Sequence, residues 1–142
     1  RRQRQMCIRD RGEGYVQKFQ GGFLTRNPDG KHFIVHGAIA EKYGEIGTAT
    51  SELGYPTGNE IAVKGGFFQP FEHGNIYWSE ATGAHTILTG DIFDEWGKRG
   101  YEQGELGWPV TDMEKIQAGG LTIDFQHGTI QQVNGNVDVR KK

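Results

Sequence analysis

Apolar residues along the chain gather in short runs that alternate with polar, glycine-containing turns. The runs "YVQKFQGGFLT" (Tyr15–Thr25) and "GFFQPFEHGNIYW" (Gly66–Trp78) predict pairs of short strands, because aromatic and β-branched residues are frequent in them. Each pair leads to a turn that ends at Gly30 or Gly83, where glycine suits a positive φ. "HFIV" or "HTIL" then predicts one more strand in each half of the chain.

Helical spacing follows each of these strands. Apolar residues fall on one face of a short helix that begins near Gly37 and again near Gly90: Ile39, Tyr43 and Ile46, then Ile92 and Trp96. Asp91 lies in a first turn, where the helix dipole favours a negative charge. We expect Gly47 and Gly100 to end the helices, and we expect Tyr43 and Trp96 to be buried.

The two halves of the chain repeat one another. "ELGYP" (Glu52–Pro56) recurs 53 positions later as "ELGWP" (Glu105–Pro109), and an "FxxG" element occurs as "FQGG", "FEHG" and "FQHG". The chain is therefore predicted to be a tandem array of α+β, β-rich repeats, each with short antiparallel strands and one short helix. We place the first repeat at residues 12–64, the second at 65–118 and a partial terminal repeat, with an Asn-Gly hairpin, at 119–142.

The repeated pentapeptide predicts a rigid bend. Tyr55 and Trp108 precede proline, which favours extended geometry, and Gly54 and Gly107 supply an unusual φ. We expect the two aromatic side chains to pack beneath the bend rather than to contact a ligand.

The charge balance argues against a nucleic-acid partner. The formal net charge is −2, but residues 1–11 contain five arginines and one aspartate, so the remaining chain carries −6. We interpret residues 1–11 as a non-native or disordered tail, because "MCIRDR" is what a common sequencing-transposon end encodes; a native basic tail is the alternative. On the first interpretation the chain is a fragment of a longer protein. Cys7 lies in this tail and does not indicate a redox compartment, and no membrane insertion is expected.

From Gly14 onward the chain resembles the LGFP repeat family, named for a Leu-Gly-Phe-Pro motif. That motif reads Leu53-Gly54-Tyr55-Pro56 and Leu106-Gly107-Trp108-Pro109, and "FEHGNIYWSEATGAHTILTGDIFDEW" (Phe71–Trp96) is the more specific match. Such repeats are typical of actinobacteria with mycolic-acid envelopes, where they extend secreted mycoloyltransferases and cell-wall hydrolases. The resemblance implies a noncatalytic, extracellular module without a cofactor. It would anchor an upstream enzyme domain to the peptidoglycan–arabinogalactan polymer, so the expected partner is cell-wall polysaccharide.

The candidate ligand-binding residues are aromatic and polar side chains of the second repeat and of the turns after each pentapeptide: Tyr77, Trp78, Asn75, Ser79 and His85, with Glu60 and Glu114. Aromatic faces pack on the C–H patches of sugars, while amides and carboxylates bind the hydroxyls. Tyr77 and Trp78 are adjacent in a strand, so one of them faces the core, and the sequence leaves open which one. His85 has a structural alternative, in which it hydrogen-bonds nearby backbone and fixes the turn. Thr25-Arg26 and Gln131-Gln132 replace the aromatic pair in the other copies.

Two other classes of function remain open. Asp91, Asp94 and Glu95 lie near one another and paired carboxylates hydrolyse glycosides, but the first copy has Ala38 and Lys42 at two of these places. No nucleophile motif supports an enzyme. A protein-interaction or spacer stalk in the envelope is harder to separate from a sugar binder. The histidines lack metal-site spacing, so no metal is expected.

Overall fold

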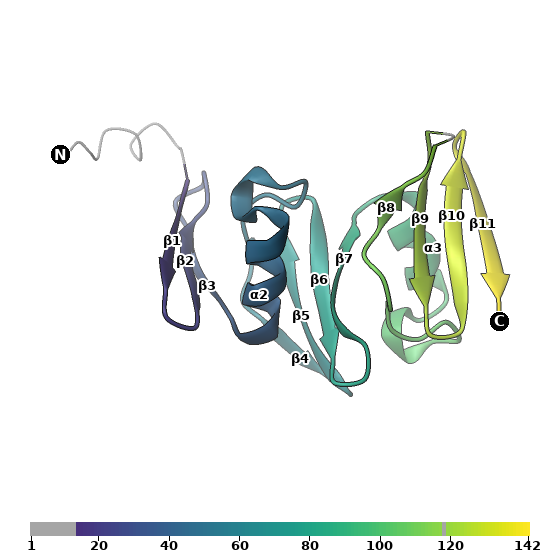
Figure 1. Cartoon of the computed structure of the whole chain (residues 1–142), viewed down its shortest axis with the longest axis horizontal. Helices are drawn as coiled ribbons and strands as arrows, with labels where there is room; N and C mark the ends of the chain where they lie inside the picture. Colours follow the sequence, from purple (N-terminus) through teal and green to yellow (C-terminus); the bar gives the residue numbers. More distant parts are fainter. Residues whose placement is uncertain (1–13, 118) are drawn as a thin grey trace.

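A computed structural model describes residues 14–117 and 119–142, which form three antiparallel sheets (Figure 1). The predicted tail at 1–11 lies outside these residues. Sheet A contains β1 (Tyr15–Phe19), β2 (Gly22–Arg26) and β3 (His32–His36). Sheet B contains β4 (Ile61–Val63), β5 (Gly66–Phe71), β6 (Gly74–Ser79) and β7 (Gly83–Leu88). Sheet C contains β8 (Glu114–Lys115), β9 (Leu121–Phe125), β10 (Gly128–Val133) and β11 (Asn136–Lys141).

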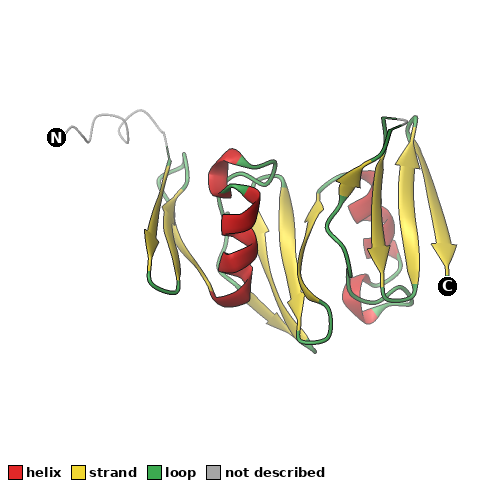
Figure 2. Cartoon of the chain, in the orientation of Figure 1, coloured by secondary structure: helices red, strands yellow, loops and turns green. Residues whose placement is uncertain are grey.

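One helix lies between each successive pair of sheets, so the molecule is a row of alternating layers (Figure 2). Helix α2 (Gly37–Ile46) lies between sheets A and B and is followed by the 3₁₀ turn η1 (Thr48–Thr50). Helix α3 (Asp91–Lys98) lies between sheets B and C and is followed by η2 (Tyr101–Gln103). This arrangement confirms the predicted array of β-rich repeats, each with short antiparallel strands and one short helix.

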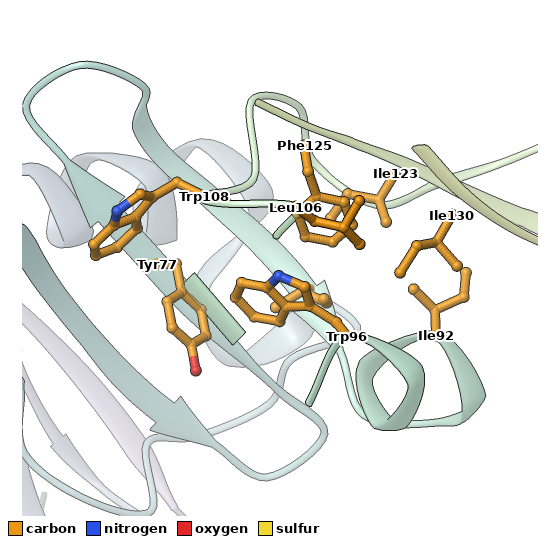
Figure 3. Close-up of a cluster of buried hydrophobic side chains, with 9 residues drawn as sticks. Tyr77, Ile92, Trp96, Leu106, Trp108, Ile123, Phe125 and Ile130 are labelled. Atoms are coloured by element: carbon orange, nitrogen blue, oxygen red, sulfur yellow. The ribbon is translucent and has the colours of Figure 1, made fainter. Parts of the chain in front are cut away.

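Each helix therefore organises its own hydrophobic core. The core around α2 contains Phe23, Val35, Ile39, Ala40, Tyr43, Leu53, Phe71 and Ile76. The core around α3 contains Tyr77, Ile87, Ile92, Trp96, Leu106, Trp108, Ile123, Phe125 and Ile130 (Figure 3). Sheet B contributes to both, because successive side chains of a strand point to opposite faces. Ile76 packs in the first core and Tyr77 in the second.

The predicted helices are confirmed, and the expected end holds for α2 but not for α3. Tyr43 and Trp96 are fully buried, as expected. Gly47 caps α2 in the left-handed conformation, with φ of 108°. Helix α3 ends one residue earlier, at the Arg99 cap, and Gly100 then adopts a φ of 100°. Asp91 lies in the first turn of α3, where the dipole favours it.

The Leu-Gly-aromatic-Pro segment fastens each helix to the hairpin of the next sheet. The backbone N–H of Tyr55 donates to Glu72 Oε1 (3.0 Å), and Glu72 N–H donates back to the Tyr55 carbonyl (2.9 Å). The second copy repeats both bonds between Trp108 and Gln126, at 3.1 and 3.0 Å. Residues 72 and 126 occupy the same place in the hairpin turn, so this reciprocal pair is a property of the repeat.

The same segment contacts the helix through the carbonyl group of its glycine. The Tyr43 hydroxyl donates to the Gly54 carbonyl at 3.0 Å, and Trp96 Nε1–H donates to the Gly107 carbonyl at 3.1 Å. Gly54 and Gly107 both have φ of 79°, which side-chain-bearing residues rarely adopt. The predicted bend is therefore confirmed, and a helix aromatic holds it in each copy.

The aromatic residue of the motif packs back onto the preceding sheet. A Cβ atom on Gly66 would lie 2.8 Å from the Trp108 ring, and one on Gly14 would lie 2.6 Å from the Tyr55 ring. Glycine is thus required at the start of β5, where a Cβ atom would also lie 2.0 Å from the Trp78 carbonyl oxygen of the neighbouring strand. Trp108 is buried beneath the bend, as predicted, and Tyr55 is half-buried. One motif therefore bridges two sheets.

Sheet C ends the described row with a polar outer face. Its inward face carries Ile123, Phe125 and Ile130, whereas the outward face carries hydrogen-bonded polar pairs. Thr129 Oγ1 donates to Asp124 Oδ1 at 2.8 Å, and Arg140 pairs with Asp138 at 2.9 Å. The predicted Asn-Gly hairpin is present between β10 and β11. This polar outer face exposes little apolar area.

Candidate functional site

Trp78 lines a cleft between sheet B and the start of α2. The cleft has a volume of about 240 Å³ and is lined by His36, Gly37, Ala38, Ile39, Glu60, Phe67 and Trp78. Trp78 is half-buried, and its ring stacks on Phe67 with a centroid separation of 5.8 Å and an interplanar angle of 28°. The two residues are cross-strand partners on β6 and β5, so the register of sheet B sets this pair.

Polar groups lie at one side of this aromatic pair. Glu60 Oε2 is 3.9 Å from His36 Nε2, and the Glu60 side chain is largely covered whereas that of His36 is exposed. His36 is the residue before α2, and Glu60 comes just before β4. A planar apolar surface beside a carboxylate and an imidazole can bind a molecule that has both C–H faces and hydroxyl groups.

The structure separates Tyr77 from Trp78. Tyr77 is only 4% exposed and stacks on Phe68 with a centroid separation of 4.8 Å. It also forms a T-shaped pair with Trp96, with ring centroids 4.9 Å apart (Figure 3). Burial raises the pKa of its hydroxyl. The question that the sequence left open is therefore answered: Tyr77 belongs to the core, and Trp78 faces the cleft.

The other predicted residues lie in three different places. Asn75 and Ser79 are buried in β6, and the Ser79 hydroxyl hydrogen-bonds the Thr82 hydroxyl in the turn before β7. Glu60 lies in the cleft with Trp78. Glu114 is exposed on β8 and lines a separate depression of about 540 Å³ beside Asp112. Of the predicted set, the structure brings Trp78 and Glu60 together.

His85 lies in a network of hydrogen bonds around Asp112. His85 Nε2 is 2.6 Å from the Thr82 carbonyl oxygen, which confirms the contact expected of a turn-fixing histidine. Its Nδ1 is 3.2 Å from Asp112 Oδ1, and Lys42 Nζ is 2.9 Å from Asp112 Oδ2. The N–H of Thr86 also donates to Asp112 Oδ1, at 3.1 Å. Burial raises the pKa of Asp112, but these hydrogen bonds lower it more, to about 2.

The carboxylates considered for glycoside hydrolysis have structural partners. Asp91 Oδ2 accepts from Gln132 Nε2 at 3.1 Å, and Glu95 Oε2 pairs with Arg99 Nε at 2.9 Å. No group of three or more His, Cys, Asp or Glu side chains that could hold a metal ion occurs in residues 14–117 and 119–142. Within the same ranges, no helix is long and apolar enough to cross a membrane.

The cleft is not repeated at the third sheet. Trp78 comes four residues after Gly74, and the residue four after Gly128 in β10 is Gln132. Gln132 hydrogen-bonds Asp91 in the first turn of α3, where α2 has Ala38. A polar bridge thus joins the helix to the sheet at the place where the aromatic cleft lies between α2 and sheet B.

Sequence reasoning missed Phe67 and His36 as parts of this cleft. Phe67 was visible only as one aromatic among several in "GFFQPF", and its pairing with Trp78 depends on strand register. His36 and Glu60 are 24 positions apart and belong to sheet A and to the approach to sheet B, so no local pattern links them.

Units that share one sheet-and-helix plan, stack in a row and are joined by one recurring motif define a tandem repeat protein. The family model described as LGFP repeat matches residues 5–51 and again residues 53–104, and the chain belongs to the LGFP repeat family. A comparison with curated proteins found no match.

Proposed function

We propose that this repeat module is noncatalytic and binds cell-wall polysaccharide, so that it anchors a secreted protein to the peptidoglycan–arabinogalactan polymer. The observation that carries the proposal is the cleft in which Trp78 and Phe67 form a stacked aromatic surface beside Glu60 and His36. Membership of the LGFP repeat family supports a repeat module, and the cleft supplies chemistry that suits a sugar.

The chemistry of the cleft favours a neutral, hydroxyl-rich ligand. Sugar rings have C–H faces that pack on an indole, and Trp78 offers such a face from a position that sheet B holds rigid. Glu60 can accept hydrogen bonds from sugar hydroxyls, and the exposed His36 can donate one. A cleft of about 240 Å³ holds a single sugar unit or two rather than a long segment of polymer.

A single cleft of this size implies weak binding by one chain. Among the described residues, the aromatic pair occurs in sheet B, because Arg26 and Gln132 stand at the matching positions of sheets A and C. Tight attachment would then require several modules on one polymer, where effective concentration multiplies weak contacts. We therefore expect anchoring strength to depend on the number of Trp-containing repeats in a protein.

Co-sedimentation with purified, protein-free peptidoglycan–arabinogalactan tests the proposal. We expect the wild-type chain to pellet with the polymer and Trp78→Ala to lose at least about tenfold in affinity, which corresponds to about 1.4 kcal/mol. Glu60→Gln should weaken binding less. Gln132→Ala changes the matching position of sheet C and serves as the control, with binding unchanged.

Folding of each variant is checked by near-ultraviolet circular dichroism and by its denaturation midpoint. Failure of the folded wild-type chain to pellet at any concentration would refute polysaccharide binding and leave a spacer or protein-docking stalk. Equal pelleting of wild type and a folded Trp78→Ala variant would place the binding surface elsewhere. Release of soluble sugar would contradict the noncatalytic assignment.

A further inference from the structure

The outer face of sheet A carries the residues that sheets B and C use to contact a preceding layer. Phe19, Leu24 and Gln20 in sheet A match Phe71, Ile76 and Glu72 in sheet B, and Phe125, Ile130 and Gln126 in sheet C. Residues are matched when they lie the same number of positions along the sequence from the glycine that begins β2, β6 or β10.

These matching residues differ sharply in exposure. Phe71 and Phe125 are 4% and 0% exposed, because the aromatic residue of the preceding helix packs on each. The ring centroids are 4.9 Å apart for Tyr43 and Phe71 and 5.1 Å apart for Trp96 and Phe125. Phe19 is 44% exposed. Ile34 extends this apolar surface on β3 as the cross-strand partner of Leu24, and it is 46% exposed.

The hairpin turn of sheet A also repeats the backbone groups of the joint. In sheet B, Glu72 N–H donates to the Tyr55 carbonyl and His73 N–H donates to the Leu53 carbonyl, both from the preceding motif. Sheet C repeats this with Gln126 and His127, which bond Trp108 and Leu106. The matching amides in sheet A belong to Gln20 and Gly21, and no acceptor for them lies among residues 14–117 and 119–142.

We propose that the outer face of sheet A, with the turn at Gln20 and Gly21, is a docking surface for a preceding repeat unit, which supplies a helix aromatic and a Leu-Gly-aromatic-Pro segment. The face continues, along the row of layers in Figure 1, the two interfaces already present in the molecule. Gln20 Oε1 would accept from the aromatic residue's N–H, as Glu72 and Gln126 do. Residues 1–13 do not spell Leu-Gly-aromatic-Pro, so the segment must come from another unit.

The neighbour is a repeat unit rather than the far end of a second copy. Sheet C presents a polar outer face with the Thr129–Asp124 and Arg140–Asp138 pairs, which does not match the apolar surface of Phe19, Leu24 and Ile34. This inference does not depend on polysaccharide binding, because Trp78 and its cleft lie on sheet B.

The test inserts one further unit into the full chain. Residues 66–119, which run from the start of β5 to just before β9, are duplicated between residues 13 and 14, so that a "LGWP" segment precedes β1 in register. Hydrogen exchange is then measured on the peptide Lys18–Phe23, which occurs once in both chains. We expect its Gln20 and Gly21 amides to exchange about 100-fold more slowly in the extended chain.

Two substitutions make the comparison specific. Gln20→Ala should leave the denaturation midpoint of the original chain unchanged and lower that of the extended chain. Phe19→Ser should behave in the same way with a larger drop, because Phe19 becomes buried only when the added unit docks.

The β6 peptide occurs twice in the extended chain, so its hydrogen exchange reports on the original and the added copy together. If both copies are folded, the peptide shows a single population that exchanges slowly. A folded extended chain whose Gln20 and Gly21 amides still exchange fast would overturn the proposal. Protection of these amides in the original chain would also overturn it. If the protection in the original chain rises with protein concentration, a second copy of the chain is the occupant. If the protection is independent of protein concentration, residues 1–13 are the occupant.

Discussion

Tyr43 and Trp96 differ in size and chemistry, yet each donates one hydrogen bond to the glycine carbonyl of a Leu-Gly-aromatic-Pro bend. The phenol hydroxyl and the indole N–H reach the same backbone atom from the same helical position. A buried carbonyl without a donor costs roughly 1–3 kcal/mol, so the bend depends on this one side-chain group. The repeat therefore conserves a hydrogen bond between its copies rather than a residue type.

At this scale, Tyr43→Phe removes only the hydroxyl that bonds the Gly54 carbonyl. We expect the free energy of unfolding to fall by about 1–2 kcal/mol, because the carbonyl stays buried and loses its donor. Urea denaturation followed by tryptophan fluorescence measures the change.

Tyr101→Phe is the matched control for that substitution. Tyr101 is 40% exposed, and its hydroxyl has no hydrogen-bond partner among the described residues. Its loss should change stability by less than about 0.5 kcal/mol. Equal effects of the two substitutions would contradict a special role for the Gly54 carbonyl.

Between elements, Asp112 joins parts of the chain that are distant in sequence. It accepts hydrogen bonds from Lys42 on α2 and from His85 and Thr86 on β7, and it follows the second Leu-Gly-aromatic-Pro segment. Burial lowers the pKa of Lys42, but its ion pairs with Asp112 and Glu45 raise it more, so the ammonium is charged across the physiological range. The network therefore joins α2 to sheet B and to the segment that leads into β8.

The pKa of Asp112 predicts acid sensitivity of this joint. Its folded-state pKa is about 2, below the ordinary 3.8, so its contribution to stability is complete above about pH 5 and is lost as the pH falls through about 2. We expect Asp112→Asn to lower the free energy of unfolding by roughly 1–2 kcal/mol at pH 7, because the variant loses the carboxylate that the network stabilises. The loss is no larger because the carboxylate is partly exposed and therefore screened by solvent. The difference between wild type and variant should shrink below about pH 5 and fall under about 0.5 kcal/mol by pH 2.

Urea midpoints of both proteins between pH 7 and pH 2 check this expectation. Asp138→Asn is the control, because Asp138 forms an exposed pair with Arg140 on β11. A constant gap between wild type and Asp112→Asn over the whole pH range would show that the depressed pKa of Asp112 does not govern the joint.

The elements that the sequence predicted are those with local signals. Helical spacing located α2 and α3, and the Asn-Gly pair located the last hairpin. The sequence did not show which of Tyr77 and Trp78 is buried. Strand alternation places the two side chains on opposite faces of the sheet, but it does not tell which part of the chain covers each face. The cleft required the pairing of Trp78 with Phe67 and the approach of His36 to Glu60, which only the packed layers determine.

Across the whole molecule, stability is shared by neighbours rather than held within one repeat. Sheet B has one face in each hydrophobic core, so it cannot unfold without exposing both. β4 begins five residues after Pro56 of the first pentapeptide and pairs with β5, so the segment that leaves the α2 layer becomes a strand of sheet B. A single repeat that is separated from its neighbours therefore lacks side chains that complete its hydrophobic core.

This sharing predicts that the matched family region does not fold alone. The second match ends at Gly104, and a variant that stops there lacks Leu106, Trp108 and all of sheet C. Trp96 and Ile92 would then lose Ile123, Phe125 and Ile130, a loss of several large buried side chains at about 2–5 kcal/mol each.

We expect the shortened chain to aggregate or to bind a hydrophobic dye, in contrast to the full chain, as judged by gel filtration and dye fluorescence. A monomeric product with intact near-ultraviolet circular dichroism would show that the α3 core does not need sheet C.

The bridging motif also has a consequence for the gene. Leu-Gly-aromatic-Pro ends one layer and begins the next, with the same contacts on both sides in each copy. Unequal crossing-over between the DNA of two such motifs adds or removes one complete period, and every junction in the product is one that the parent already contained. The array can thus lengthen or shorten between generations without any new interface having to evolve.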